Sequence, residues 1–169
     1  HPIYRSHYTA SGPVPMIYSS ANYLIRADVL RRMGYPFLDE GFDFTGGGDT
    51  DFFTRARRGG IGFHWCQEAA MTEIMPARRT ETDWIRARGI RNGQISALIA
   101  RKACRTPRDH LRRLAHTGLL LAASPLRAAL MALRTGSAEI GLYPMLVAWG
   151  RLTAEFGGRV EQYRQPDKN

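Results

Sequence analysis

The spacing of hydrophobic residues divides the chain into a mixed first part and a helical second part. Before residue 76 the apolar segments are short, and glycine and proline separate them. Residues 1–15 are rich in Pro, Gly, Ser and Tyr and predict a loop. The pattern that follows predicts strands over 16–25, 61–65 and 70–75, and helices over 28–33 and 50–58. This part of the chain is therefore expected to be α/β.

The second part reads as helices. A helix is predicted over 82–102, and strongly apolar helical stretches follow at 111–133 and 140–149, with Pro125 and Arg127 expected to interrupt the first. Because spanning a bilayer takes about 20 apolar residues, neither stretch is predicted to span one. The arginines beside them leave two readings open: helices lying in a membrane interface, or ordinary helices packed on the preceding domain.

The whole chain has a net charge of +9, and its excess of basic residues lies in one stretch. Residues 1–77 hold 7 Arg against 8 acidic residues, whereas residues 78–134 hold 13 Lys and Arg against 3 acidic residues. Such a stretch is expected to face nucleic acid, anionic lipid or a diphosphate. Interleaved Leu and Ala with few aromatic residues favour lipid, so no nucleic-acid partner is predicted.

Cysteine and histidine usage predicts no metal site. Cys66 and Cys104 form no CxxC pair, which is compatible with a reducing compartment. His64 and Cys66 would share one side of a strand, but two ligands do not make a zinc site. The chain begins with His1 and shows no signal-peptide pattern, so we expect a segment of a longer protein.

The segment Phe42–Arg55, FDFTGGGDTDFFTR, carries the strongest chemical signal. Its three glycines form a turn that presents Asp49 at the start of a helix. A carboxylate in that place can accept a proton from a substrate hydroxyl, as a general base does. Asp49 or Asp51 could instead simply cap the helix, and the residues alone leave both roles open.

The order of several motifs resembles family-2 glycosyltransferases, in particular those that build succinoglycan-type exopolysaccharides. The motifs are NYLIR at 22–26, FLDE at 37–40, GGGDTDFFTR at 46–55, AMTE at 70–73 and W-x-x-x-R-x-x-R-x-G at 84–93. The tail, with GRL at 150–152 and GGRVEQY at 157–163, resembles the ending of these proteins. The resemblance covers roughly residues 16–163.

The resemblance implies the C-terminal part of a GT-A-like nucleotide-diphospho-sugar transferase fold, followed by apolar and basic helices. Residues 1–103 would form the acceptor-side part, and residues 104–169 a helical membrane-proximal region. The implied activity is inverting transfer of a sugar from a nucleotide-sugar donor to a polysaccharide or lipid-linked glycan acceptor. The implied location is the cytoplasmic membrane surface, on its inner face.

The resemblance also assigns roles to single residues. Asp49 matches the general base, Asp51 matches a second acid that orients the helix start or the acceptor, and Asn22 lies on the acceptor side. Glu73 matches a further family position, for which support of the fold is the expected role.

An aromatic and basic helix completes the implied site. Trp84 is expected near the acceptor, and Arg88 and Arg91 near the donor diphosphate, because planar guanidinium groups pair well with phosphate oxygens. A solvated helix face remains the alternative for these arginines.

Two departures from the family pattern bear on activity. Gly48 stands where the family usually has Glu, which predicts some loss of activity or a rearranged acceptor site. The family's D-x-D motif, which holds a divalent Mg or Mn ion against the donor, has no equivalent before residue 16. The alternative reading is therefore a basic amphipathic membrane-docking module, or an inactive fragment without catalysis of its own.

Overall fold

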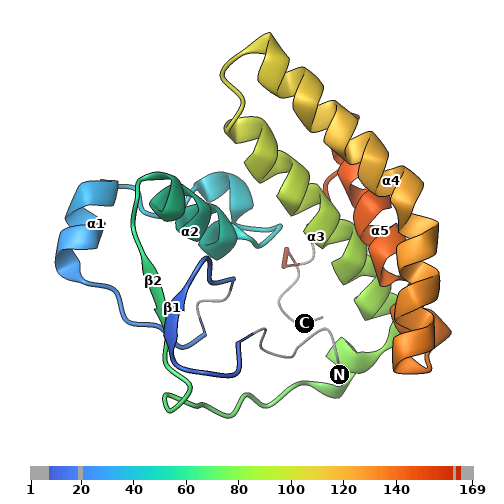
Figure 1. Cartoon of the computed structure of the whole chain (residues 1–169), viewed down its shortest axis with the longest axis horizontal. Helices are drawn as coiled ribbons and strands as arrows, with labels where there is room; N and C mark the ends of the chain where they lie inside the picture. Colours follow the sequence, from blue (N-terminus) through green and yellow to red (C-terminus); the bar gives the residue numbers. More distant parts are fainter. Residues whose placement is uncertain (1–7, 19–20, 162, 165–169) are drawn as a thin grey trace. The chain divides into compact units, whose positions relative to one another are not determined.

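The computed structural model describes residues 8–18, 21–161 and 163–164, which fall into two compact units, 1–75 and 76–169 (Figure 1). The described residues are mostly helical, with one small two-stranded sheet. The first unit ends before the helix that begins at Thr82. The functional division predicted at 103/104 falls at a turn inside the second unit.

The first unit combines two helices with the small sheet. Its elements are β1 (Gly12–Val14), α1 (Ala27–Met33), a 3₁₀ turn (Glu40–Phe42), α2 (Gly48–Arg58) and β2 (Phe63–Trp65). The strands β1 and β2 are antiparallel, with Pro13 opposite His64. Both predicted helices are confirmed, and the strand predicted over 61–65 is confirmed in its second half. The loop predicted for residues 1–15 is wrong at 12–14, where β1 forms.

Two predicted strands are wrong among the described residues. Residues 16–18, 21–25 and 70–75 form no strand. Met16 is buried in the core instead of pairing in a sheet. A side-chain hydrogen bond connects two of these extended regions. The Asn22 Nδ2 group donates a hydrogen bond of 2.8 Å to the carbonyl of Ala69, just before residues 70–75.

Aromatic rings hold α2 in the first unit. Phe53 is 2% exposed and packs with Met16 and Phe52. Its ring makes edge-on contacts with Phe52, Tyr23 and Phe63 at centroid distances of 5.5, 5.8 and 6.0 Å. Edge-to-face pairs of this kind add to the free energy gained by burial. Residues from four parts of the unit thus meet at one side chain of α2.

Three long helices make up the second unit: α3 (Thr82–Lys102), α4 (Pro107–Thr135) and α5 (Ala138–Glu155). α5 packs against both α3 and α4, which make few contacts with each other. Thr82 donates a hydrogen bond of 2.7 Å to Glu139 near the starts of α3 and α5, and Gln94 donates one of 3.2 Å to Thr153 further along. These two helices therefore run in the same direction.

The predicted break in α4 at Pro125 is absent. Proline has no N–H group, so the Leu121 carbonyl loses its usual helical donor. The Ser124 hydroxyl donates a hydrogen bond of 2.8 Å to that carbonyl and replaces the missing partner. A capping box between Thr106 and Asp109 starts the helix before Pro107. α4 is therefore continuous over 29 residues.

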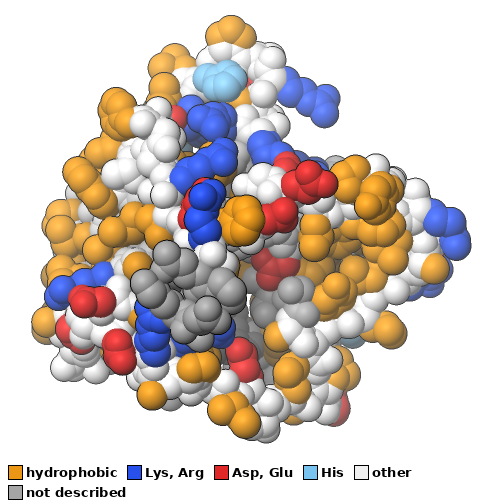
Figure 2. Space-filling model, turned by 180° about the vertical axis from the view of Figure 1, so that it is seen from behind, with side chains coloured by type: hydrophobic (Ala, Val, Ile, Leu, Met, Phe, Trp, Pro, Cys, Tyr) orange, Lys and Arg blue, Asp and Glu red, His pale blue; other side chains and the backbone are white. Residues whose placement is uncertain are grey.

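α4 is long and apolar enough to cross a membrane, by length and composition alone. Its most apolar window is only 17% buried within the protein. Figure 2 shows hydrophobic side chains gathered on the side of the molecule where α4 lies. The shorter helix predicted from the sequence depended on the break at Pro125, which the structure does not have.

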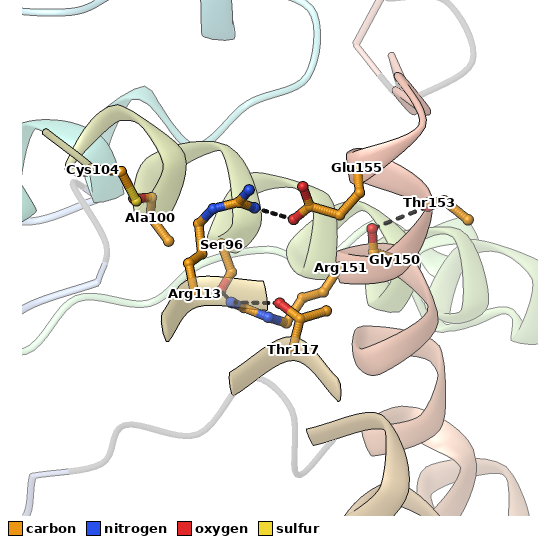
Figure 3. Close-up of polar contacts among 9 residues, drawn as sticks. All are labelled: Ser96, Ala100, Cys104, Arg113, Thr117, Gly150, Arg151, Thr153 and Glu155. Atoms are coloured by element: carbon orange, nitrogen blue, oxygen red, sulfur yellow. Dashed lines mark hydrogen bonds and ion pairs between the residues drawn. The ribbon is translucent and has the colours of Figure 1, made fainter. Parts of the chain in front are cut away.

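A polar cluster joins the three helices of the second unit (Figure 3). The buried Arg151 of α5 donates to Ser96 of α3 and, at 3.4 Å, to Thr117 of α4. Arg113, near the start of α4, forms an ion pair with Glu155 at the end of α5. α4 therefore runs antiparallel to α5. Burial lowers the pKa of Arg151, and the charge of Glu155 opposes that shift.

Glycine allows the backbones of α3 and α5 to approach closely. A Cβ atom on Gly93 would lie 2.1 Å from the Val147 carbonyl oxygen. One on Gly150 would lie 1.9 Å from the Ile90 carbonyl oxygen. Both obstacles are backbone atoms, which cannot rotate away. The contact between these helices therefore requires glycine at both positions.

We predict that Gly93→Ala destabilises the chain by roughly 3 kcal/mol, at the upper end of the usual cost of overpacking. The matched control is Gly118→Ala on the exposed side of α4, where a Cβ meets nothing within 4 Å. That variant should gain about 0.5–1 kcal/mol because alanine suits a helix better than glycine. Urea unfolding followed by circular dichroism measures both, and equal midpoints for Gly93→Ala and the unchanged chain would contradict the account.

Candidate functional site

A glycine turn sets the position of Asp49. Gly46 and Gly47 have φ angles of 71° and 93°, in the left-handed region that glycine adopts without strain. The chain then enters α2 at Gly48, so that Asp49 lies in the first helical turn. The Asp49 side chain is half-buried, and its Oδ1 atom accepts a hydrogen bond of 2.7 Å from the Thr50 N–H. Asp49 is therefore held at a helix start while part of it stays accessible.

Asp51 lies in a different environment, although it is only two residues away. It is 1% exposed, and its Oδ2 atom accepts a hydrogen bond of 2.8 Å from Arg55 Nε, one helical turn later. Arg55 also donates to the Phe37 carbonyl and lies over the Phe52 ring. The sequence reasoning missed Arg55 as the partner of Asp51, although the i, i+4 spacing was a readable signal.

The structure thus separates the predicted acids by access. Asp51 is enclosed and joined to Arg55, whereas Asp49 is half-buried at the start of α2. Asn22, predicted on the acceptor side, is exposed and its amide is joined to the Ala69 carbonyl. Of these three side chains, Asp49 is the one that is both a carboxylate and partly accessible to solvent.

The second group of predicted residues lies on α3, in the other unit. Trp84 is 5% exposed, and three guanidinium groups lie over its ring: Arg88 at 5.4 Å, Arg79 at 5.7 Å and Arg91 at 5.9 Å from the centroid. Cations over an indole face are attracted by its quadrupole. The sequence reasoning missed Arg79, because it lies in a 3₁₀ turn (Ala77–Thr80) before α3 and outside the helical spacing.

Arg91 and Arg88 differ in access. Arg91 is 5% exposed, between the rings of Trp84 and Tyr163, with Tyr163 at 4.9 Å. Burial lowers the pKa of Arg91, and Tyr163 opposes that shift. Its Nε and Nη1 atoms find no hydrogen-bond acceptor within the part of the chain that the structure describes. Arg88 is half-buried, so it is the more accessible of the two predicted diphosphate ligands.

The remaining candidates add no metal centre. Across residues 8–18, 21–161 and 163–164, no three His, Cys, Asp or Glu side chains lie together as a metal site would require. His64 in β2 and Cys66 just after it are both exposed, and so is Glu73.

Comparison with known proteins adds no further guide. No family model, curated protein or solved structure matches the chain.

The two acids should respond differently to loss of charge. We predict that Asp51→Asn lowers the free energy of unfolding by roughly 1–3 kcal/mol, because it leaves a partly solvated Arg55 without its buried counter-ion. Asp49→Asn should change it by less than about 0.5 kcal/mol, because an amide oxygen can still accept from the Thr50 N–H. Urea denaturation measures both variants, and an equal loss in the two would contradict the separation of roles.

Proposed function

We propose that this chain is the acceptor-side and membrane-proximal part of an inverting glycosyltransferase of family-2 type, with a GT-A-like fold in the complete enzyme. It would transfer a sugar from a nucleotide-sugar donor to a polysaccharide or lipid-linked glycan. The order of the sequence motifs supports the family. The observation that carries the proposal is the half-buried Asp49 carboxylate, held at the start of α2 beside the enclosed Asp51–Arg55 pair.

The chemistry requires one base on the acceptor side. The Asp49 carboxylate takes the proton of an acceptor hydroxyl as that oxygen attacks the anomeric carbon of the donor sugar. The new glycosidic bond forms on the face opposite the diphosphate. The bond from the anomeric carbon to the diphosphate oxygen breaks at the same time, and the nucleoside diphosphate leaves with the electron pair. One displacement of this kind inverts the anomeric configuration.

Arginine on α3 suits the departing group. A guanidinium offers several donors to phosphate oxygens and stabilises the negative charge that develops on them. Arg88 is the stronger candidate because it is more accessible than Arg91, which packs between two rings. The divalent Mg or Mn ion implied by the resemblance belongs to the donor-binding half, and no step assigned to these residues depends on it.

Asp49→Asn should abolish transfer in an enzyme that includes the donor-binding half. Loss of a general base predicts a decrease in kcat of roughly 100- to 10 000-fold, with the donor Kd unchanged. The matched control is Asp43→Asn, an exposed acid in the loop before the glycine turn, which should retain full activity. Radiolabelled sugar transfer gives kcat and donor titration gives the Kd. Full transfer by Asp49→Asn would remove the assigned base.

The glycine at position 48 offers a second test. A Cβ there would meet Phe42 at 3.8 Å and Leu38 at 4.0 Å, which are ordinary contacts, so the backbone accepts a side chain at this position. We predict that Gly48→Glu increases transfer by restoring the family's usual acid, and stabilises the chain by roughly 0.5–1 kcal/mol through helix propensity and the helix dipole. Gly48→Gln is the matched control: it should be stabilised but should not transfer faster. If both variants accelerate transfer equally, the restored charge is not the cause.

A further inference from the structure

The outer face of α4 carries a stripe of exposed leucines. Leu119, Leu126 and Leu133 recur every seven residues and are each at least two thirds exposed. Seven residues make about two helical turns, so these side chains lie along one line. Leu130 and Leu111 lie beside that line and are also exposed. We call these five residues the leucine stripe.

The leucine stripe lies opposite the face that packs within the protein. Thr117, Ser124 and Ala128 are the buried residues of α4, and they fall on the other side of the helix. α5 exposes a second apolar row, Leu142, Met145 and Trp149, at spacings of three and four residues. Exposed apolar surface of this extent marks an interaction site.

A basic stripe runs beside the leucines. Arg112, His116, Arg127 and Arg134 are exposed on α4, and their spacings of 4, 11 and 7 residues keep them within a narrow sector of the helix. The stripe extends for about 33 Å along the axis, from the rise of 1.5 Å per residue. Asp109 is the one acid of α4, and it is used in the capping box. A stripe with this charge would suit an anionic partner.

The combination of exposed leucines and exposed arginines on one helix distinguishes between possible partners. Nucleic acid would satisfy the arginines but would leave the leucines in water. A membrane-spanning helix concentrates its charges at the two ends, whereas Arg127 lies inside the apolar segment, between Leu126 and Leu130 and eight residues before α4 ends at Thr135. An arginine at the centre of a spanning helix costs roughly 2.5–3.5 kcal/mol. A helix lying in the membrane interface meets neither difficulty.

We propose that α4 lies in the plane of an anionic membrane surface, with the leucine stripe in the acyl boundary and Arg112, Arg127 and Arg134 on lipid phosphates. This surface is independent of the transfer reaction, so its failure would leave the role of Asp49 untouched.

Vesicle flotation of the full chain tests the basic stripe. The chain should float with phosphatidylcholine vesicles that contain phosphatidylglycerol, and much less with phosphatidylcholine alone. Arg127→Gln with Arg134→Gln should weaken partitioning about 30-fold, from about 1 kcal/mol per arginine. The control removes the same charge from exposed Arg57 and Arg58 at the end of α2 and should leave binding unchanged. Equal loss in both pairs, or no flotation of the unchanged chain, would overturn the proposal.

A second pair of variants tests the leucine stripe. Leu119→Gln with Leu126→Gln should abolish flotation while helix content stays constant, because both side chains are already exposed. Leu24→Gln with Leu38→Gln, at exposed sites of the first unit, should float normally. If the unchanged chain does not float but forms a dimer that the Leu119 and Leu126 changes dissociate, the stripe is an interface between copies and the proposal is wrong.

Labelling separates a lying helix from a spanning one. With Cys66 and Cys104 replaced by serine, a single cysteine is placed at exposed Arg108 or at exposed Ala138, close to the two ends of α4. A membrane-impermeant maleimide added outside the vesicles should label both positions. Protection of one end alone would mean that α4 spans the bilayer, and the in-plane arrangement would be refuted.

Discussion

The candidate site depends on the ion pair between Asp51 and Arg55. It joins the first turn of α2 to the next, and Arg55 also holds the Phe37 carbonyl, so the helix start is tied to the loop before it. A carboxylate enclosed to this degree needs a charged partner, since burying an isolated charge is costly. Of these two acids, Asp51 is occupied in this way and Asp49 stays partly accessible.

The second unit is built on a different constraint, the close approach of α3 and α5. Glycine at positions 93 and 150 brings two backbones together, and α4 then packs on the far side of α5. Because α5 occupies the middle of the second unit, neither α3 nor α5 covers the outer face of α4. The arginines of this unit fall into two groups. Arg113 and Arg151 bond to other helices of the unit, whereas Arg112, Arg127 and Arg134 are exposed on α4.

Local signals in the sequence predicted much of this arrangement. Helices α1, α2 and α3 were located because glycines at 34 and 59 and the apolar spacing after residue 82 act within a few residues. Strands were predicted poorly, because an apolar segment such as that at Met16 has the same pattern whether it pairs in a sheet or packs as extended chain. In α4 the hydroxyl of Ser124 bonds the carbonyl that Pro125 leaves without its usual donor, a contact that helix propensity does not register.

The site was predicted in part for the same reason. The position of Asp49 at a helix start could be predicted from the glycines beside it in sequence. The pairing of Arg55 with Asp51 could have been predicted from their i, i+4 spacing. Arg79 and Tyr163 were not, because they reach Trp84 and Arg91 from outside the periodic part of α3 through tertiary packing. The central claim is a single displacement assisted by one carboxylate, and the stereochemistry of the product tests it most directly. Proton NMR of the product's anomeric signal should show a β-linkage from an α-linked donor; an α-linked product would contradict the account.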